Sequence, residues 1–187
     1  MDAGPIVAQR KEIIDENENA TVLLPKLFKI GTEMLMDVLP DVINGKITMD
    51  TATVQDEDQV VNADMIDSSE GELFLDKESA RVCHNKVRGF SMWPGTFMYV
   101  QIGESSPENV PVKLKIIESK VLADAGSEPL TSDIVLGPKK GDGLRVVCGD
   151  GSVLELLRVQ PVTRNAMDAK SFVNGLRGET LNWVKMP

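Results

Sequence analysis

The stretch GDGLRVVCGDGSVLELLRVQP, residues 141–161, sets the fold class of the chain. It contains two β-rich runs, residues 144–148 and 153–159, and each run is preceded by Gly-Asp-Gly. Gly and Asp tolerate the positive φ angles that tight hairpin turns require, so both tripeptides predict turns. Neither tripeptide is followed by Lys and then Ser or Thr, as a phosphate-binding loop would require. We therefore expect two strands bounded by structural turns.

Three further β-rich runs lie upstream, at residues 96–102, 112–122 and 134–137. Gly, Pro, Ser and Asp separate the five runs at spacings that suit a small barrel.

Short helices are predicted on both sides of this barrel. The first is capped by Asp76 and ends at Gly89. The second begins near Asp168 and ends at Gly175 or Gly178.

The first 48 residues predict one strand and one helix. The strand is expected over residues 5–14. The helix is expected to start with Thr21 as its N-cap, because apolar residues between 23 and 39 recur at spacings of three and four. It is predicted to end between residues 40 and 45, and the polar residues 48–58 have the composition of an interdomain linker.

The composition is that of a globular protein. Of 187 residues, 42% are hydrophobic, which allows one full domain and a fragment. The net charge of -9 is unevenly distributed: residues 1–83 hold 7 Lys/Arg and 18 Asp/Glu, a balance of -11, and residues 84–187 hold 13 and 11, a balance of +2. Only the second part favours a phosphate-binding patch. Neither a membrane span nor a signal peptide is predicted, so we expect a soluble protein.

Cys83 and Cys148 are the only cysteines, and His84 is the only histidine. The cysteines are far apart in the sequence and neither belongs to a paired-cysteine motif, so we predict neither a disulfide framework nor a zinc site. A reducing compartment fits best. A single histidine excludes a multi-histidine metal site, and a Ser-His-Asp triad would have to use His84.

Two segments resemble a known family. Residues 84–97, HNKVRGFSMWPGTF, are similar to the helix-to-barrel signature of the formyltransferase C-terminal domain. Residues 148–161, with Arg164 and residues 167–175, resemble the closing strand pair and last helix of the methionyl-tRNA formyltransferase family in particular.

The resemblance extends upstream over nearly the whole chain. Residues 27–39 and 55–57 resemble the last helix of the family's catalytic domain and the linker after it. Two residues depart from the family pattern: Met65 stands where the family commonly has Lys, and Pro25 falls within the helix.

The resemblance implies an α+β chain with three parts. Residues 1–48 correspond to a strand-helix remnant of a Rossmann-like catalytic domain, residues 49–75 to a linker, and residues 76–187 to an OB-like, tRNA-binding barrel with flanking helices. In the family, 10-formyltetrahydrofolate and the catalytic Asn, His and Asp belong to the Rossmann-like domain, upstream of residue 1. We therefore expect neither a catalytic residue nor a bound cofactor in this chain, and no formyl transfer by this chain alone.

The resemblance also names initiator methionyl-tRNA as the expected partner. Proteins position themselves on nucleic acid mainly through phosphate contacts from Lys and Arg. Arg158 is a further cation available to a phosphate-binding surface. The residues predicted to contact tRNA are Arg88, Lys113, Lys115, Lys139, Lys140, Arg164 and Lys170.

His84 and Trp93 each allow a functional and a structural interpretation. For His84, a packing or hydrogen-bonding role is favoured over catalysis. Trp93, with Pro94 and Gly95, is expected to be a buried aromatic anchoring a tight turn, and a platform for base stacking is the less favoured interpretation.

Two rival interpretations remain open. In the first, the chain is a shortened product of a complete formyltransferase. In the second, it is a docking protein that has lost tRNA binding and uses residues 1–48 for self-association or a partner. The expected compartment is the cytoplasm of a bacterium, or the mitochondrion or plastid of a eukaryote.

Overall fold

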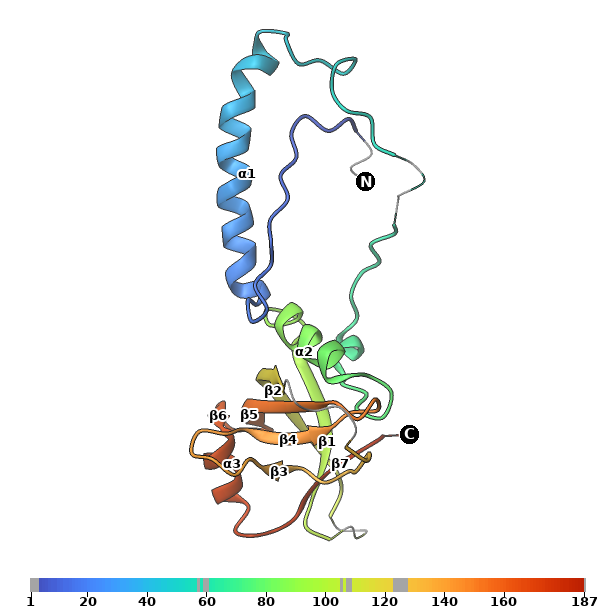
Figure 1. The fold of residues 1–187 in the computed structure, drawn as a ribbon, viewed down its shortest axis with the longest axis vertical. Coiled ribbons are helices and arrows are strands. Elements are labelled where there is room, and N and C mark those ends of the chain that lie inside the picture. The colour runs from blue at the N-terminus through green and yellow to red at the C-terminus, as the bar shows by residue number, and fades with distance from the viewer. Residues whose placement is uncertain are drawn as a thin grey trace. The chain divides into compact units, whose positions relative to one another are not determined.

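Figure 1 shows the computed structural model, which describes residues 4–56, 58, 61–104, 106, 109–122 and 128–186. The contacts divide the chain into two compact units, Met1–Met65 and Ile66–Pro187. The division falls inside the segment 49–75 that the sequence predicts as a linker. Each unit is described by itself.

The first unit contains one long helix, α1 Ala20–Ile43, as the spacing of apolar residues predicts. Asn19 caps this helix, because its side chain accepts a hydrogen bond from the Val22 N–H at 3.2 Å. The cap therefore lies two residues before the predicted Thr21. Beyond the helix end, Gly45 has a φ of 71°, the left-handed conformation common at helix C-termini.

The strand predicted over residues 5–14 does not form. Residues 7–14 carry no strand, and the segment pairs through one isolated bridge between Ile6 and Thr53. A strand is stable only beside a partner of several residues, and the described part of this unit supplies no such partner. The local β pattern is therefore overridden by the absence of a neighbouring sheet.

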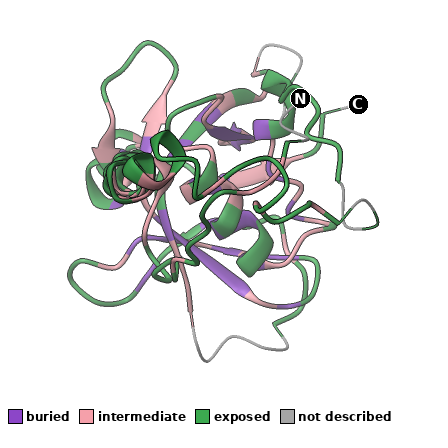
Figure 2. Ribbon diagram, turned by 90° about the horizontal axis from the view of Figure 1, so that it is seen from above, coloured by how far each residue is buried: buried purple, intermediate pink, exposed green. Residues whose placement is uncertain are grey.

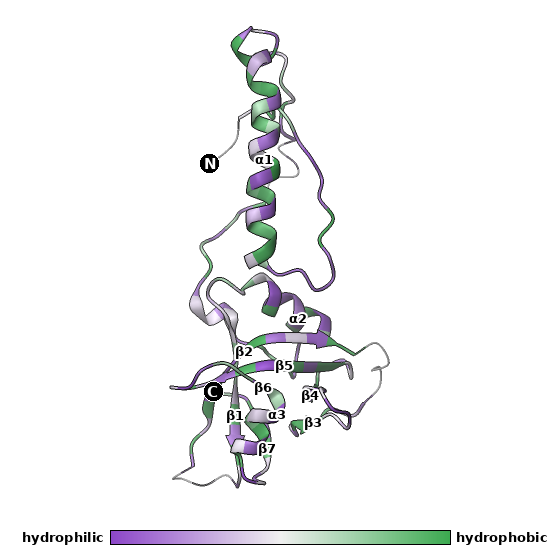
Figure 3. Cartoon of the chain, turned by 90° about the vertical axis from the view of Figure 1, so that its left-hand side faces the viewer, coloured by the Kyte–Doolittle hydropathy of each residue, from purple (hydrophilic) through white to green (hydrophobic). Residues whose placement is uncertain are grey.

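Apolar side chains of α1 remain at the surface of the first unit. None of its residues is fully buried, and Phe28, Leu35 and Met36 are 69%, 56% and 61% exposed. Figure 3 shows hydrophobic residues along this helix, interspersed with hydrophilic ones. Only a stripe that includes Leu23 and Met34 is half-buried.

The second unit is built around an antiparallel sheet. The strand order is β3-β4-β5-β2-β1-β7, and β6 pairs with β5 outside this path. An isolated bridge between Asp133, just before β3, and Asn182 of β7 joins the two edges, so the sheet is a nearly closed barrel. The strands are β1 Thr96–Ile102, β2 Val112–Val121, β3 Val135–Leu136, β4 Leu144–Val147, β5 Val153–Pro161, β6 Met167–Asp168 and β7 Leu181–Val184.

The five predicted strands all form, which confirms the mixed α+β class and the barrel. The prediction missed β6 and β7, which contain two and four residues.

Capping residues begin two of the helices of this unit. Asp76 is not the cap of α2: the Ser79 hydroxyl accepts from the Val82 N–H at 3.2 Å, so the helix starts later than predicted. Asp168 does cap α3, accepting from the Ser171 N–H at 2.8 Å. The helical segments are η2 Ser68–Gly71, α2 Ala80–Gly89 and α3 Ala169–Gly175.

The core of this unit includes residues that precede the predicted barrel domain. Leu73 and Leu75 are 4% and 2% exposed and belong to the buried hydrophobic cluster. Figure 2 shows buried residues along strands of the structure. The Leu73 N–H donates to the Phe97 carbonyl at 2.9 Å. A Cβ on Gly149 would lie 2.5 Å from the Asp76 carbonyl oxygen, so only glycine permits this close approach. Residues 66–75 are thus part of the folded unit.

Candidate nucleic-acid interface

Two lysines of β2 face the same side of the barrel. Lys113 and Lys115 are separated by one residue, and alternate residues of a strand share a face. Lys115 lies opposite Phe97 of β1 on one side and opposite Gln160 of β5 on the other. Lys113 Nζ lies 3.3 Å from the centroid of the Phe97 ring, a cation–π contact that holds this ammonium group in place.

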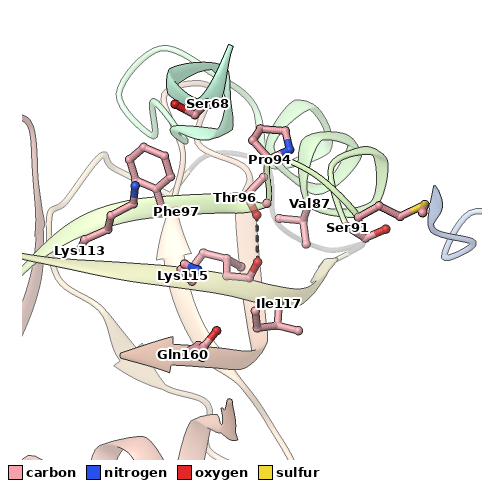
Figure 4. A pocket seen from close by; sticks show the side chains of 13 residues that line it. Ser68, Val87, Ser91, Pro94, Thr96, Phe97, Lys113, Lys115, Ile117 and Gln160 are labelled. Carbon is pink, nitrogen blue, oxygen red and sulfur yellow. Dashed lines mark hydrogen bonds between the residues drawn. The ribbon is translucent and has the colours of Figure 1, made fainter. Parts of the chain in front are cut away.

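A pocket of about 360 Å³ opens beside the two lysines (Figure 4). The hydroxyl-bearing Ser68 and Ser91 line it together with apolar groups such as Val87. The Thr96 hydroxyl, which also lines it, donates to the Ile116 carbonyl at 2.9 Å and is already satisfied, as the dashed line shows. The pocket therefore combines cationic and neutral polar groups with an apolar wall.

A second pocket, of about 310 Å³, shares Lys113, Lys115 and Gln160 with the first. The lysines thus stand between two hollows. Positive charge between hollows suits an anionic ligand that is wider than a single group.

Carboxylates neutralise many of the other cations of this unit. Within the described ranges, no carboxylate lies at ion-pair distance from six of the seven predicted tRNA contacts, namely Lys113, Lys115, Lys139, Lys140, Arg164 and Lys170. The seventh, Arg88, donates from Nε to Asn85 Oδ1 at 3.1 Å. The ion pairs join Lys86 to Glu78, Lys120 to Glu155, Arg145 to Asp142 and Glu155, Arg158 to Glu118, and Lys185 to Asp76.

The seven predicted contacts do not form one cluster. Lys113 and Lys115 share a face and two pockets. The other five are distributed over the last turn of α2, the β3–β4 turn, the turn after β5 and the start of α3. The lysine pair is therefore the best-defined part of the predicted interface.

His84 has the structural role that the sequence favours. It is 3% exposed, and its Nδ1 lies 3.0 Å from the hydroxyl of Ser119, which is also buried. A ring enclosed in this way cannot reach a substrate at the surface.

The cysteines are both buried and free, and the fold brings them together. A hydrogen bond with Cys148, together with burial, raises the pKa of the Cys83 thiol well above its ordinary value. Among the described residues, no group of three His, Cys, Asp or Glu side chains could hold a metal ion. In the same part of the chain, no helix is long and apolar enough to cross a membrane.

The expectation that Trp93 is buried is wrong. Its side chain is 57% exposed, although the tight turn forms as predicted, with a hydrogen bond from the Gly95 N–H to the Phe90 carbonyl at 2.9 Å. The φ of 78° at Gly95 explains the turn without a buried aromatic anchor, because glycine adopts this conformation at no steric cost.

Residues 65–177, more than half of the chain, match the family model described as formyl transferase, C-terminal domain. The chain is 35% identical over 175 residues to a methionyl-tRNA formyltransferase of Listeria innocua and 36% identical over 176 residues to one of Lactococcus lactis subsp. lactis. It belongs to the methionyl-tRNA formyltransferase family. These alignments cover 94% of this chain and 51% and 50% of the two relatives, so the chain spans about half their length.

Solved structures agree with the fold. Two variants of HypX from Aquifex aeolicus match with TM-scores of 0.59 and 0.61, at 14% and 13% identity. The matches cover 95% of this chain and 30% and 29% of those chains. At this identity the likeness shows the fold alone.

The family's sequence signature reaches the surface formed by Lys113 and Lys115, which we call the lysine face. Phe97 is the last residue of the signature at residues 84–97, and Lys113 Nζ lies over its ring. Phe97 and Gln160 were not predicted from the sequence as site residues. Both reach the site through antiparallel register, which a single sequence does not reveal.

Proposed function

We propose that the unit Ile66–Pro187 binds initiator methionyl-tRNA through its backbone phosphates, as the tRNA-binding part of a methionyl-tRNA formyltransferase. A methionyl-tRNA formyltransferase transfers a formyl group from 10-formyltetrahydrofolate to the methionyl amine during translation initiation. Family membership supports this proposal, and one observation of the structure carries it. Lys113 and Lys115 stand together on one face, without a carboxylate partner in the described part of the chain.

Each residue of the face has a distinct role in this proposal. Lys115 is exposed and supplies a compact positive charge to a phosphate. Lys113 is half-buried on the Phe97 ring, so its ammonium group is held in position before RNA arrives. Gln160, whose Nε2 donates to the Arg164 carbonyl at 2.9 Å, adds a neutral carboxamide beside them. Phosphate contacts of this kind set affinity and orientation and carry no sequence information.

The remaining cations extend the proposed contact over a larger surface. Lys139 and Lys140 lie at the β3–β4 turn, where their side chains are exposed. Lys170 lies on α3 and Arg88 on α2. Shape and backbone charge, rather than base edges, are the usual means by which proteins recognise folded RNA helices.

We propose no catalytic role for this chain. Formyl transfer needs a proton acceptor for the amine and donors for the developing oxyanion, held in fixed geometry. The single histidine is enclosed in the barrel unit. We assign residues 1–48 to the end of a catalytic domain and residues 49–65 to a linker, and we expect no formylation of methionyl-tRNA by this chain alone.

The double substitution Lys113→Gln and Lys115→Gln in the whole chain tests the binding proposal. Removing two phosphate contacts is expected to weaken tRNA binding at low salt by roughly tenfold or more. Lys185→Gln is the matched control, because Lys185 forms an ion pair with Asp76 at 3.1 Å and lines neither pocket. Equal affinities for the double variant and the control would reject the lysine face as the binding surface.

One observation favours a second function for the first unit. The exposed apolar face of α1, with Phe28 and Leu35, resembles a docking surface more than a solvated helix face. We propose that this face binds a protein surface while the barrel binds tRNA. If no tRNA binds the chain at low salt, docking alone becomes the preferred function.

A further inference from the structure

Trp93 is an exposed aromatic residue at the rim of the first pocket. The residues on either side of it, Met92 and Pro94, line this pocket together with Lys113 and Lys115. The Trp93 side chain is 57% exposed, and the Met92 side chain is 58% exposed. Neighbouring large apolar side chains at a surface mark an interaction site more often than isolated ones do. The indole next to the lysine face therefore calls for a ligand.

The turn that carries Trp93 is held from two sides. The Gly95 N–H donates to the Phe90 carbonyl at 2.9 Å and closes the turn. The segment η2 packs directly against the turn, since a Cβ on Gly71 would overlap the Gly95 carbonyl oxygen. The indole is therefore presented on a fixed backbone. A ligand that covers it loses less free energy to ordering of the protein than it would on a flexible loop.

The chemistry around Trp93 suits a nucleobase. Lys113 and Lys115 have no carboxylate at ion-pair distance among the residues that the structure describes, so the surface beside the indole attracts an anion. Proteins hold single-stranded RNA by combining such cations, which contact phosphates, with aromatic side chains on which the bases stack. An apolar protein partner would instead bury the two ammonium groups without compensation.

We infer that Trp93 stacks on an unpaired base of the bound RNA, next to the phosphate that the lysine face holds. The inference rests on the proposed function and adds to it a base contact, which phosphate binding alone does not provide. Every base has a flat π-face, so this contact selects an unpaired nucleotide and not a particular base. Bases inside an RNA helix are already stacked on their neighbours, so the site prefers a loop, a bulge or a single-stranded end.

Tryptophan fluorescence of the whole chain tests this inference, because the chain has only two tryptophans. Trp183 of β7 is half-buried and its Nε1 donates to the Thr131 carbonyl at 2.9 Å, so it is the internal reference. Titration with an initiator tRNA transcript is expected to quench the native chain, because a stacked base quenches indole emission. In Trp93→Phe only Trp183 remains, and the same titration is expected to leave its emission unchanged after correction for absorbance by the RNA. Equal fractional quenching of the two proteins would overturn the inference.

Binding affinity provides the second measurement. Trp93→Ala is expected to bind the transcript roughly 5- to 150-fold more weakly at low salt, the cost of one lost base stack. The slope of log affinity against log salt is expected to keep its native value, because an indole releases no counterions, whereas the double lysine variant flattens it. Leu130→Ala is the matched control and is expected to change neither quantity, since its side chain is 51% exposed and lines neither pocket of the lysine face.

The outcomes separate this inference from the proposed function. If the double lysine variant weakens binding while Trp93→Ala keeps the native affinity, the base stack is rejected and the proposed function stands. If the native chain binds no tRNA at low salt, both are rejected. Inorganic polyphosphate, an anion without bases, is expected to compete with the RNA without quenching the native chain, and quenching by polyphosphate would overturn the stack. Trp93→Ala is expected to keep the native thermal unfolding curve, and if it does not, the fluorescence titration of the native chain and Trp93→Phe decides.

Discussion

Residues 66–75 are expected to be indispensable for the barrel, although the sequence alone predicts them as a linker. Leu73 and Leu75 lie in the core, and the Leu73 N–H is bonded to the Phe97 carbonyl at 2.9 Å. Full burial of a leucine side chain contributes about 1.5–3 kcal/mol, so removing both costs about 3–6 kcal/mol. A domain of this size unfolds with a free energy of about 5–15 kcal/mol. A chain starting at residue 76 is therefore expected to be less stable than residues 66–187 by about 3–6 kcal/mol.

Urea denaturation followed by circular dichroism measures this loss in the whole chain, residues 66–187 and residues 76–187. The first two are expected to share the unfolding transition of the barrel, and the third to unfold at much lower urea. In the whole chain, Leu75→Ala is expected to cost about 2–5 kcal/mol. Leu130→Ala is the matched control: its side chain is 51% exposed, and such substitutions cost within about 0.5 kcal/mol. Equal midpoints for the two shortened chains, or equal costs for the two leucines, would refute the reasoning.

Three further predictions concern other parts of the chain. Glu155 is fully buried and is paired with Lys120 at 2.6 Å and Arg145 at 3.5 Å, so Glu155→Gln is expected to cost about 3 kcal/mol in urea denaturation. Glu118→Gln, which breaks an exposed pair with Arg158, is expected to cost less than about 1 kcal/mol, and similar values for the two would contradict the burial argument. Because the pKa of Cys83 is raised from 9.0, the unfolded chain releases this proton first as the pH rises, and stability is expected to fall above about pH 9 by up to about 1.4 kcal/mol per pH unit. Urea midpoints on either side of that pH should show a fall that Cys83→Ala reduces, and an identical fall in both proteins would exclude Cys83 as its source. The exposed face of α1 is expected to cause self-association, which light scattering detects and which Phe28→Glu with Leu35→Glu is expected to abolish; a monomeric native chain with uniformly slow hydrogen exchange over residues 4–48 would count against this.

Local patterns predicted the elements whose formation depends on local physics. The Gly-Asp-Gly turns, strands β1 to β5 and the cap at Asp168 follow from turn chemistry, β-rich composition and side-chain hydrogen bonding within a few residues. The strand over residues 5–14 failed for the opposite reason, since its stability depends on a partner that no local pattern specifies.

The candidate site was predictable as a set of cations and not as an arrangement. Lys113 and Lys115 were identified by charge alone, whereas Phe97 and Gln160 join them through pairing between distant strands. The exposure of Trp93 was also hidden, because Gly95 stabilises the turn that the aromatic was expected to anchor.

The most direct test of the central claim is a salt titration of tRNA binding by the whole chain and by residues 66–187. If about three phosphates are contacted, log affinity is expected to fall with log salt at a slope of roughly -2 to -3 for both chains. The shorter chain is expected to bind more tightly, because it lacks the acidic residues of the first unit. An affinity independent of salt, or no binding at low salt, would contradict the claim that this barrel binds tRNA through its phosphates.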